Sequence, residues 1–381
     1  MKNIKVGKNH GTNLVSSNGK TVQVKKVLVT EIEKVLEKNI DQCANGKNKR
    51  VGHLTIEKRE SQIFGFVADM YALDFCIESM LNIREKHVRA WVEFLVNNEQ
   101  MPSTIQNKLS FLRVYCNWIG KPGFVRSPEF YVEDSSLVKR TTATKHDKSW
   151  DSLDKQKLLD VITLKDKYIG MQNRLCDEFG LRRVESIMFK PHVDDEGDYL
   201  YVHSGTKGSR PRIVPVVNAV QRALLEEAKQ LADPKTGLIA PPGKTLKQAI
   251  NRFKYVMKYC GLTKKSVGVT AHGLRHGYVH KRYEDRTGGK LPVKGGKPGD
   301  VDPTLDKIAK LKTMEEVGHS RVSVGTAYGG SFGHAGRANH RHEITEEELG
   351  IAICESLESL KKWGLEEPNE NETENEVELI A

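Results

Sequence analysis

Long apolar stretches are missing from this 381-residue chain. No run approaches the ~20 consecutive apolar residues of a membrane-spanning helix, and the opening segment lacks the apolar region of a secretory signal. The six cysteines are scattered and form no C-x-x-C pair, which argues against a disulfide framework and against a cysteine-based zinc site. These absences predict a cytoplasmic protein without membrane contact, whose cysteines are buried structural thiols.

Negative charge is scarce in most of the chain and concentrated at its end. The net charge is +10. Residues 343–381 hold 13 Glu and 2 Lys, a net charge of −11, so the first 342 residues carry +21. A body this basic indicates a polyanionic partner, most often nucleic acid. At this length the chain predicts two or three domains with sizeable cores.

The N-terminal 140 residues divide at about residue 58. Residues 1–58 are polar and basic, with one amphipathic stretch at 27–36. Two interpretations stay open for them, an arm-type DNA-binding module and a solvated extension. Residues 59–140 have helical patterns, and Ile105 to Ile119 form an apolar stripe at spacings of four and three. Helices are expected at 63–81, at 87–96 and from an N-cap at Ser103 or Thr104.

The remainder of the chain begins with a polar linker at 134–148. Residues 141–342 predict a second domain, with helical patterns at 153–162 and 246–259. Two short β-prone runs at 199–203 and 213–217 flank a glycine-containing turn, which predicts a β-hairpin. Residues 285–302 are rich in Gly, Pro, Lys and Asp and predict a long loop. Residues 343–381 predict a C-terminal helix at 346–363 and an acidic tail.

Several short groups of polar residues in the second half of the chain, which are named below, fit neither a buried core nor an ordinary surface. Each group alone is weak evidence of function, because an arginine is usually part of a surface ion pair and a lysine in a turn is usually solvated. His272 and His276 are four residues apart, as in a zinc-binding helix, but Gly273 stands where a metalloprotease has its glutamate. No metal site is therefore predicted there. A mobile surface cluster is the favoured interpretation of three further histidines, His334, His340 and His342.

The order and spacing of these clusters resemble the signature of the tyrosine recombinase (phage integrase) family. Gly180-Leu-Arg182-x-x-Glu185 and His272-Gly-Leu-Arg275-His276 match the family motifs as written. A lysine, Lys207, lies in the expected hairpin, and Arg212-Ile-Val-Pro-Val216 looks like the strand that follows it. Tyr328 follows the histidine of Gly-His319-Ser by nine residues. The resemblance covers about residues 150–335, and residues 59–140 are similar in kind to the family's core-binding domain.

The resemblance implies a site-specific recombinase or integrase that cuts DNA through a 3′-phosphotyrosyl intermediate. Because that bond stores the energy of the broken phosphodiester, no ATP is expected. No other cofactor is expected, and the arginines make a metal ion unnecessary. Arginines suit the phosphate because they stay protonated and bind its oxygens with a planar fork. The implied catalytic set is Arg182, Lys207, His272, Arg275, His319 and Tyr328.

Individual roles follow from the same resemblance. Lys207 is expected to protonate the leaving 5′-hydroxyl, His272 to receive the Tyr328 proton, and His319 to bind a phosphate oxygen. Glu185 and His276 are expected to support the site from behind. Arg183 is an alternative to Arg182 by position, but the motif selects Arg182. Further DNA contacts are predicted at Lys108, Arg113, Arg210 and Arg212.

The sequence departs from the family pattern in several places. Val317 replaces the usual Leu before Gly-His319, and 44 residues separate Arg275 from His319. The excess length is the loop around 285–302, which either contacts DNA or a neighbouring subunit or is an inert insertion. Gly329 and Gly330 directly follow Tyr328, which would let that tyrosine move. The acidic tail is a candidate autoinhibitory mimic of DNA.

Taken together, the sequence predicts a mainly α protein with a small antiparallel β-sheet in an α+β catalytic domain, plus a helical core-binding domain. By the resemblance, the two domains form a clamp around double-stranded recombination sites. The implied working species is a nucleoid-associated homotetramer that forms a Holliday junction, assisted by DNA-bending or directionality proteins, in integration or excision of a mobile element. Two alternatives remain: a type IB topoisomerase-like or telomere-resolving enzyme, and a non-catalytic DNA-binding accessory protein.

Overall fold

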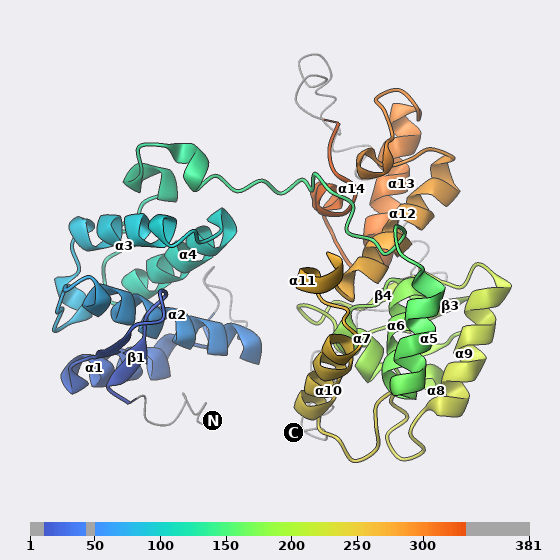
Figure 1. Cartoon of the computed structure of the whole chain (residues 1–381), viewed down its shortest axis with the longest axis horizontal. Coiled ribbons are helices and arrows are strands. Elements are labelled where there is room, and N and C mark those ends of the chain that lie inside the picture. The colour runs from blue at the N-terminus through green and yellow to red at the C-terminus, as the bar shows by residue number, and fades with distance from the viewer. Residues whose placement is uncertain (1–10, 43–49, 333–381) are drawn as a thin grey trace. The chain divides into compact units, whose positions relative to one another are not determined.

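The computed structural model describes residues 11–42 and 50–332 (Figure 1). Within them the chain is mainly helical, with two small antiparallel sheets of two strands each. The predicted fold class is confirmed. The chain divides into two compact units, Met1–Thr141 and Thr142–Ala381. None of the described helices has the length and apolar character needed to cross a membrane. The predicted C-terminal helix, the acidic tail and His334, His340 and His342 lie outside the described residues.

The first unit is a helical bundle with a small hairpin against it. Leu14 faces Val22 across the hairpin, which packs on α2. The stripe predicted in the last helix is buried, from Ile105 through Leu109 and Leu112 to Cys116. That helix begins at Pro102, and its N-cap is Met101, two residues before Ser103, the first of the two predicted N-caps. The elements are β1 (Asn13–Val15), β2 (Thr21–Gln23), α1 (Lys26–Asn39), α2 (His53–Ala72), η1 (Met80–Asn82), α3 (Glu85–Asn97), α4 (Pro102–Trp118), η2 (Pro128–Tyr131) and η3 (Ser135–Leu137).

The expected division at residue 58 does not appear in this core. Leu28, Ile32 and Leu36 of α1 are fully buried in the same hydrophobic cluster as α2, α3 and α4. Ser17 donates from its backbone N–H and its hydroxyl to the buried carboxylate of Asp69 on α2. The described part of residues 1–58 is therefore built into the first unit, because the apolar stripe of α1 is buried against the other helices of that unit.

The second unit holds the hairpin and the longer C-terminal helices. Helix α6 lies between α5, α9 and α12 in the core (Figure 1), and its buried face includes Leu175 and Phe179. The elements are α5 (Lys155–Lys165), α6 (Lys167–Phe179), α7 (Arg183–Met188), α8 (Pro191–Asp194), β3 (Tyr199–Val202), β4 (Arg212–Pro215), α9 (Ala219–Leu231), α10 (Leu246–Tyr259), α11 (Lys264–Val267), α12 (His272–Thr287), η4 (Pro292–Lys294), α13 (Pro303–Glu316), η5 (Val322–Gly325) and α14 (Thr326–Gly329).

The predicted hairpin and loop are present in this unit. Strands β3 and β4 are antiparallel, with Tyr199 opposite Pro215 and Val202 opposite Arg212. Helix α12 continues to Thr287, three residues into the predicted loop, and ends where Gly288 adopts a positive φ. The rest of the loop carries only the short turn η4 before α13 begins. The fold therefore brings together the start of α12, the end of α13 and the short helix α14.

Candidate active site

The first turn of α12 supplies three of the motif side chains. His272, Arg275 and His276 are spaced by three and four residues, so they share one face of the helix. Gly273 faces the other way, where an added Cβ would lie 2.3 Å from the Lys148 carbonyl oxygen and 2.8 Å from the Trp150 ring. Only a glycine fits this close approach. The contact with the chain at 148–150 therefore fixes which face of α12 turns toward the site.

Arg275 is fully buried at the centre of the site. Its Nη1 donates to the Gly180 carbonyl oxygen and its Nη2 to the Val317 carbonyl oxygen. Its Nε donates to the Tyr328 hydroxyl over 3.1 Å. Burial lowers the pKa of this guanidinium to about 10, so it remains a cation at neutral pH. Its position is fixed by backbone acceptors from two separate segments.

Arg182 and Arg212 are joined by one carboxylate. Glu185 accepts from Arg182 Nη1 over 2.6 Å and from both Nη atoms of Arg212 over 2.8 and 2.7 Å. It also accepts from the backbone N–H of Arg182, which caps α7. Burial opposes ionisation of Glu185, but hydrogen bonding and the charges of Arg212, Arg182 and Arg275 lower its pKa to about 2. This ionised carboxylate holds the Arg182 side chain in place.

Backbone carbonyl groups in the turn after α13 accept hydrogen bonds from the guanidinium groups of Arg182, Arg212 and Arg275. The Val317 carbonyl oxygen accepts from Arg182 over 3.0 Å as well as from Arg275. The Glu316 carbonyl oxygen accepts from Arg212 Nε over 2.8 Å. Gly318 follows with a φ of +67°, a conformation that glycine adopts without strain. This turn both orients the arginines and presents His319 to the site.

Helix α14 carries Tyr328, which is buried. Its hydroxyl lies 3.1 Å from Arg275 Nε and 3.1 Å from His319 Nε2. Its ring lies 4.7 Å from the ring of His276 and 6.1 Å from that of His272, measured between centroids. Because Arg275 donates to the hydroxyl oxygen, the hydroxyl proton is free to point at His319.

The histidines around Tyr328 are held in their neutral form. Burial, followed by the charges of Arg275 and Arg182, lowers the pKa of His319 to about 4. The same causes lower the pKa of His272 to about 4. Burial and the neighbouring histidines lower the pKa of His276 to about 3. Neutral imidazoles can accept a proton at pH 7, which is what an attacking hydroxyl requires.

Comparison with known proteins agrees with this geometry. A family model described as "Integrase" matches residues 138–281, and one described as "Phage integrase, N-terminal" matches residues 33–125. The chain belongs to the tyrosine recombinase (phage integrase) family. The Integrase match ends before His319 and Tyr328, so the assignment of these two residues rests on motif spacing and on the contacts described above. A search of curated proteins finds no match.

Solved structures of integrases share the fold. A lambda integrase (75–356) dimer bound to a COC′ core site is 15% identical, over 84% of this chain and 99% of that one, with a TM-score of 0.52. The Tn1549 transposon integrase in complex with circular intermediate DNA is 15% identical, over 80% and 97%, with a TM-score of 0.50. A lambda integrase tetramer bound to a Holliday junction is 14% identical, over 83% and 79%, with a TM-score of 0.50.

Lys207 of this integrase-family chain is placed differently from the other five motif residues. It is exposed in the turn between β3 and β4, and Gly205 and Gly208 beside it have positive φ angles. Its charge contributes to the lowered pKa of His319, so it lies within electrostatic reach of the site. The other five side chains form one connected cluster around the Tyr328 hydroxyl.

The four arginine and lysine side chains predicted to contact DNA have different surroundings. Arg210 is exposed and donates to Ser320 Oγ over 3.2 Å. Lys108 is mostly buried and donates to Ser17 Oγ over 2.6 Å. Arg113 donates to the backbone carbonyls of Val125 and Arg126. Arg212 is buried on Glu185, so its guanidinium is already fully engaged inside the protein.

Two supporting residues escaped the sequence analysis. Glu316 is buried, and its carboxylate accepts from Arg282, Arg286 and Tyr278 of α12. This fixes the end of α13 whose carbonyls receive the three arginines. His280 is also buried, with Nε2 3.0 Å from the Tyr328 carbonyl oxygen. Its spacing of four from His276 and eight from His272 was a readable signal for a shared helix face.

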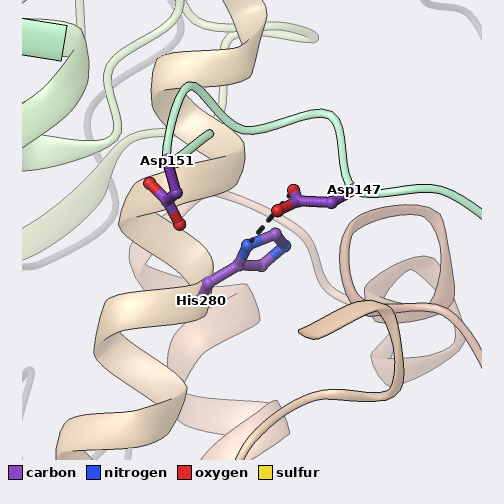
Figure 2. Close-up of side chains that lie close together, drawn as sticks. All are labelled: Asp147, Asp151 and His280. Carbon is purple, nitrogen blue, oxygen red and sulfur yellow. Dashed lines mark ion pairs between the residues drawn. The ribbon is translucent and has the colours of Figure 1, made fainter. Parts of the chain in front are cut away.

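One group of side chains in the described residues has the spacing of a metal site. Ligand atoms of Asp147, Asp151 and His280 lie within 4.8 Å of one another (Figure 2). Lys294 Nζ donates to both carboxylates, over 3.1 Å to Asp147 and 2.8 Å to Asp151. These carboxylates raise the pKa of Lys294 above its usual value against the opposing effect of burial. An ammonium group therefore already supplies positive charge to these carboxylates.

Proposed function

We propose that this chain is a site-specific DNA recombinase that breaks and rejoins strands through Tyr328. The observation that carries the proposal is the Tyr328 hydroxyl, which lies within hydrogen-bonding distance of both Arg275 and His319. A tyrosine hydroxyl has a pKa of about 10 and is a weak nucleophile unless cations and a base assist it. Both kinds of group contact this hydroxyl.

In the proposed cleavage step, the Tyr328 oxygen attacks a DNA phosphorus and the bond to the 5′-oxygen breaks. The products are a 3′-phosphotyrosyl ester and a free 5′-hydroxyl, so the phosphodiester energy is retained. Arg182 and Arg275 stabilise the charge on the phosphate oxygens. Lys207 supplies the proton of the departing 5′-hydroxyl from the hairpin turn. A 5′-hydroxyl from a second duplex then reverses the step and exchanges strands.

The contacts favour a different proton acceptor from the one expected at first. His272 was the expected acceptor, and its ring centroid lies 6.1 Å from that of Tyr328, against 5.7 Å for His319. Lowered pKa values leave both imidazoles neutral, but it is His319 whose Nε2 lies within hydrogen-bonding distance of the hydroxyl oxygen, at 3.1 Å. We therefore assign the Tyr328 proton to His319 and contact with the phosphate to His272. Glu185 and Arg212 act by positioning Arg182.

The partners follow from the same proposal. The +21 charge of residues 1–342 suits a DNA duplex, and the integrases of similar fold were solved on DNA, one as a tetramer on a Holliday junction. We propose that this chain binds double-stranded recombination sites and works as a homotetramer, with accessory DNA-bending proteins, to integrate or excise a mobile element. Exposed Arg210, beside the site, is the proposed DNA contact among the predicted basic residues.

Two alternatives remain, and the first of them would use the same catalytic residues. A type IB topoisomerase-like or telomere-resolving enzyme would relax or close one duplex, whereas a recombinase joins strands from two. A relaxation assay and a strand-exchange assay separate them. A non-catalytic accessory protein would bind DNA without forming a covalent bond. The connected cluster of Arg182, Arg275, His319 and Tyr328 favours a catalytic protein over that last alternative.

The test is covalent capture on DNA that flanks the coding sequence, with a nick placed to trap the intermediate. We expect the wild type to form an SDS-resistant adduct in EDTA, and Tyr328→Phe to form none while binding the DNA as tightly. Tyr255→Phe is the matched control, because that tyrosine is exposed on α10, away from the side chains that contact Tyr328. An adduct with Tyr328→Phe would refute the assignment of the nucleophile.

A further inference from the structure

The segment that leads into the second unit lies against the helices of the site. The backbone N–H of Thr144 donates to the Thr326 carbonyl oxygen of α14 over 2.9 Å. Further along, Trp150 Nε1 donates to the Thr270 carbonyl oxygen, just before α12, over 2.8 Å. Asp147 lies between these two anchors in sequence. Residues 144–150 are therefore attached to both helices that carry the candidate active site.

His280 connects Asp147 to the main chain of Tyr328. Its Nε2 lies 3.0 Å from the Tyr328 carbonyl oxygen, and since a carbonyl only accepts, this nitrogen carries the proton. Its Nδ1 lies 3.7 Å from Asp147 Oδ1 (Figure 2) and has no hydrogen-bond partner among residues 11–42 and 50–332. The ring is 4% exposed. A buried imidazole thus bonds to the backbone of the proposed nucleophile and lies beside the Asp147 carboxylate.

The long loop after α12 contacts both Asp147 and the end of α14. Lys294 bonds to Asp147 and Asp151, and its loop packs on the end of α14. A Cβ added to Gly329 would lie 2.7 Å from Leu291, and one added to Gly330 would lie 2.9 Å from Val293 and 3.0 Å from the Thr144 carbonyl oxygen. The two glycines after Tyr328 are enclosed between the loop and the linker.

We propose that Asp147, acting through His280 and Lys294, positions the main chain of Tyr328 for attack. A helix of four residues cannot hold itself together, because one turn costs more in conformational entropy than its hydrogen bond returns. Its position must come from contacts outside the helix. Three lie at its own ends: Thr144 on Thr326, His280 on Tyr328, and the loop on Gly329 and Gly330. This inference rests on the proposed role of Tyr328 as nucleophile.

A bound metal ion is the competing explanation of the same three side chains. A metal-ligating histidine commonly donates its second nitrogen to a carbonyl, as His280 does. The ammonium group of Lys294, however, already bridges both aspartates. A divalent ion would have to displace it from two charge-assisted hydrogen bonds. We therefore infer that the ammonium group of Lys294, and not a metal ion, is the cation that binds Asp147 and Asp151.

The experiment measures single-turnover adduct formation and DNA affinity for Asp147→Asn, His280→Ala and His280→Gln. Because small misplacements of reacting atoms cost up to about 100-fold in rate, we expect Asp147→Asn and His280→Ala to slow adduct formation by roughly tenfold or more, with unchanged DNA affinity. His280→Gln should recover most of the rate, since its side-chain amide can donate to the Tyr328 carbonyl. Asp160→Asn, on the exposed face of α5, is the matched control.

Hydrogen exchange gives a second readout that does not need DNA or activity. In Asp147→Asn we expect faster amide exchange in residues 326–332 and wild-type exchange in α6. A wild-type adduct rate in Asp147→Asn, or a His280→Gln rate as low as that of His280→Ala, would overturn the inference. A manganese-dependent rise in melting temperature that Asp147→Asn abolishes would show that a metal ion, and not the ammonium group of Lys294, neutralises these carboxylates.

The failure of the two proposals can be told apart. If the wild type forms no Tyr328-dependent adduct, the proposed function fails, while the exchange measurement still tests the contact between Asp147 and α14. If the wild type forms the adduct and Asp147→Asn equals it in rate and in exchange, only the positioning role fails.

Discussion

At the scale of single residues, Glu185 shows how charge is arranged in this site. It is 1% exposed, and its two oxygens bind Arg182 and Arg212, with Arg275 Nη1 3.9 Å away. Three cations close together repel one another, and a buried carboxylate between them offsets that repulsion. The site can therefore present Arg182 and Arg275 to a phosphate while remaining folded without DNA.

Replacing Glu185 by Gln should cost stability in a pH-dependent way. The folded carboxyl ionises at about 2, against about 4.5 when unfolded, so its contribution is complete above pH 4.5 and is lost as the pH falls toward 2. That difference corresponds to roughly 3 kcal/mol. We expect Glu185→Gln to lower the free energy of unfolding by roughly 3–5 kcal/mol at pH 7, and by less at pH 3.

Urea unfolding at both pH values measures this, with Glu284→Gln as control because that carboxylate is exposed on α12. A difference between the wild type and Glu185→Gln that stays the same from pH 7 to pH 3 would contradict the account. Adduct formation by Glu185→Gln should also fall, because Arg182 loses the partner that orients it.

At the scale of elements, the end of α6 positions two arginines with one turn. Gly180 ends the helix with a φ of +60°, and its carbonyl oxygen accepts from Arg275. Two residues later Arg182 caps α7. The G-L-R motif is therefore a helix-to-helix turn, in which the glycine adopts a conformation that other residues avoid. The motif was singled out from the sequence by its place in the family signature, and its three residues are close together in the chain because they form this one turn.

Gly180→Ala should be more damaging than an ordinary glycine replacement. An added Cβ would lie 2.5 Å from the Tyr278 ring, so overpacking adds about 1–3 kcal/mol to the cost of a left-handed alanine, about 1–2 kcal/mol. Gly268→Ala is the control, because Gly268 has a φ of +75° and open space around it. Equal losses in the free energy of unfolding for both variants would show that the contact with Tyr278 is unimportant.

At the scale of the whole molecule, the chain has two separate main cores. One cluster unites α1 with α2, α3 and α4, and the other surrounds α6 and α12. The division between the units falls at residues 141 and 142. A core substitution should therefore lower the free energy of unfolding of one unit only, because the cavity that it leaves destabilises the core in which it forms.

Calorimetry of the full chain should show two unfolding transitions. Leu36→Ala should shift one of them and Leu175→Ala the other, each with a loss of about 2–5 kcal/mol in the unit concerned. Both leucines are fully buried, one in each core. A single transition that both variants lower alike would mean that the units unfold as one.

The sequence by itself determined the family, the fold class and the short-range framework. Helical stripes, the hairpin and the G-L-R and H-x-L-R-H motifs are local patterns, because residues a few positions apart share a face or a turn. The catalytic residues were predicted from the resemblance of these short motifs to those of the family, and they remain a prediction. Spacing alone did not decide which histidine meets the Tyr328 hydroxyl.

The tertiary structure decided the contacts between distant segments. Asp147 and Lys294 are 147 residues apart in sequence, and Arg212 meets the Glu316 carbonyl across 104. It placed the apolar face of α1 in the core of the first unit and turned Arg212, a predicted DNA contact, inward onto Glu185. Such pairings carry no periodic signal, because they depend on how whole helices pack and on which buried charges must find a partner.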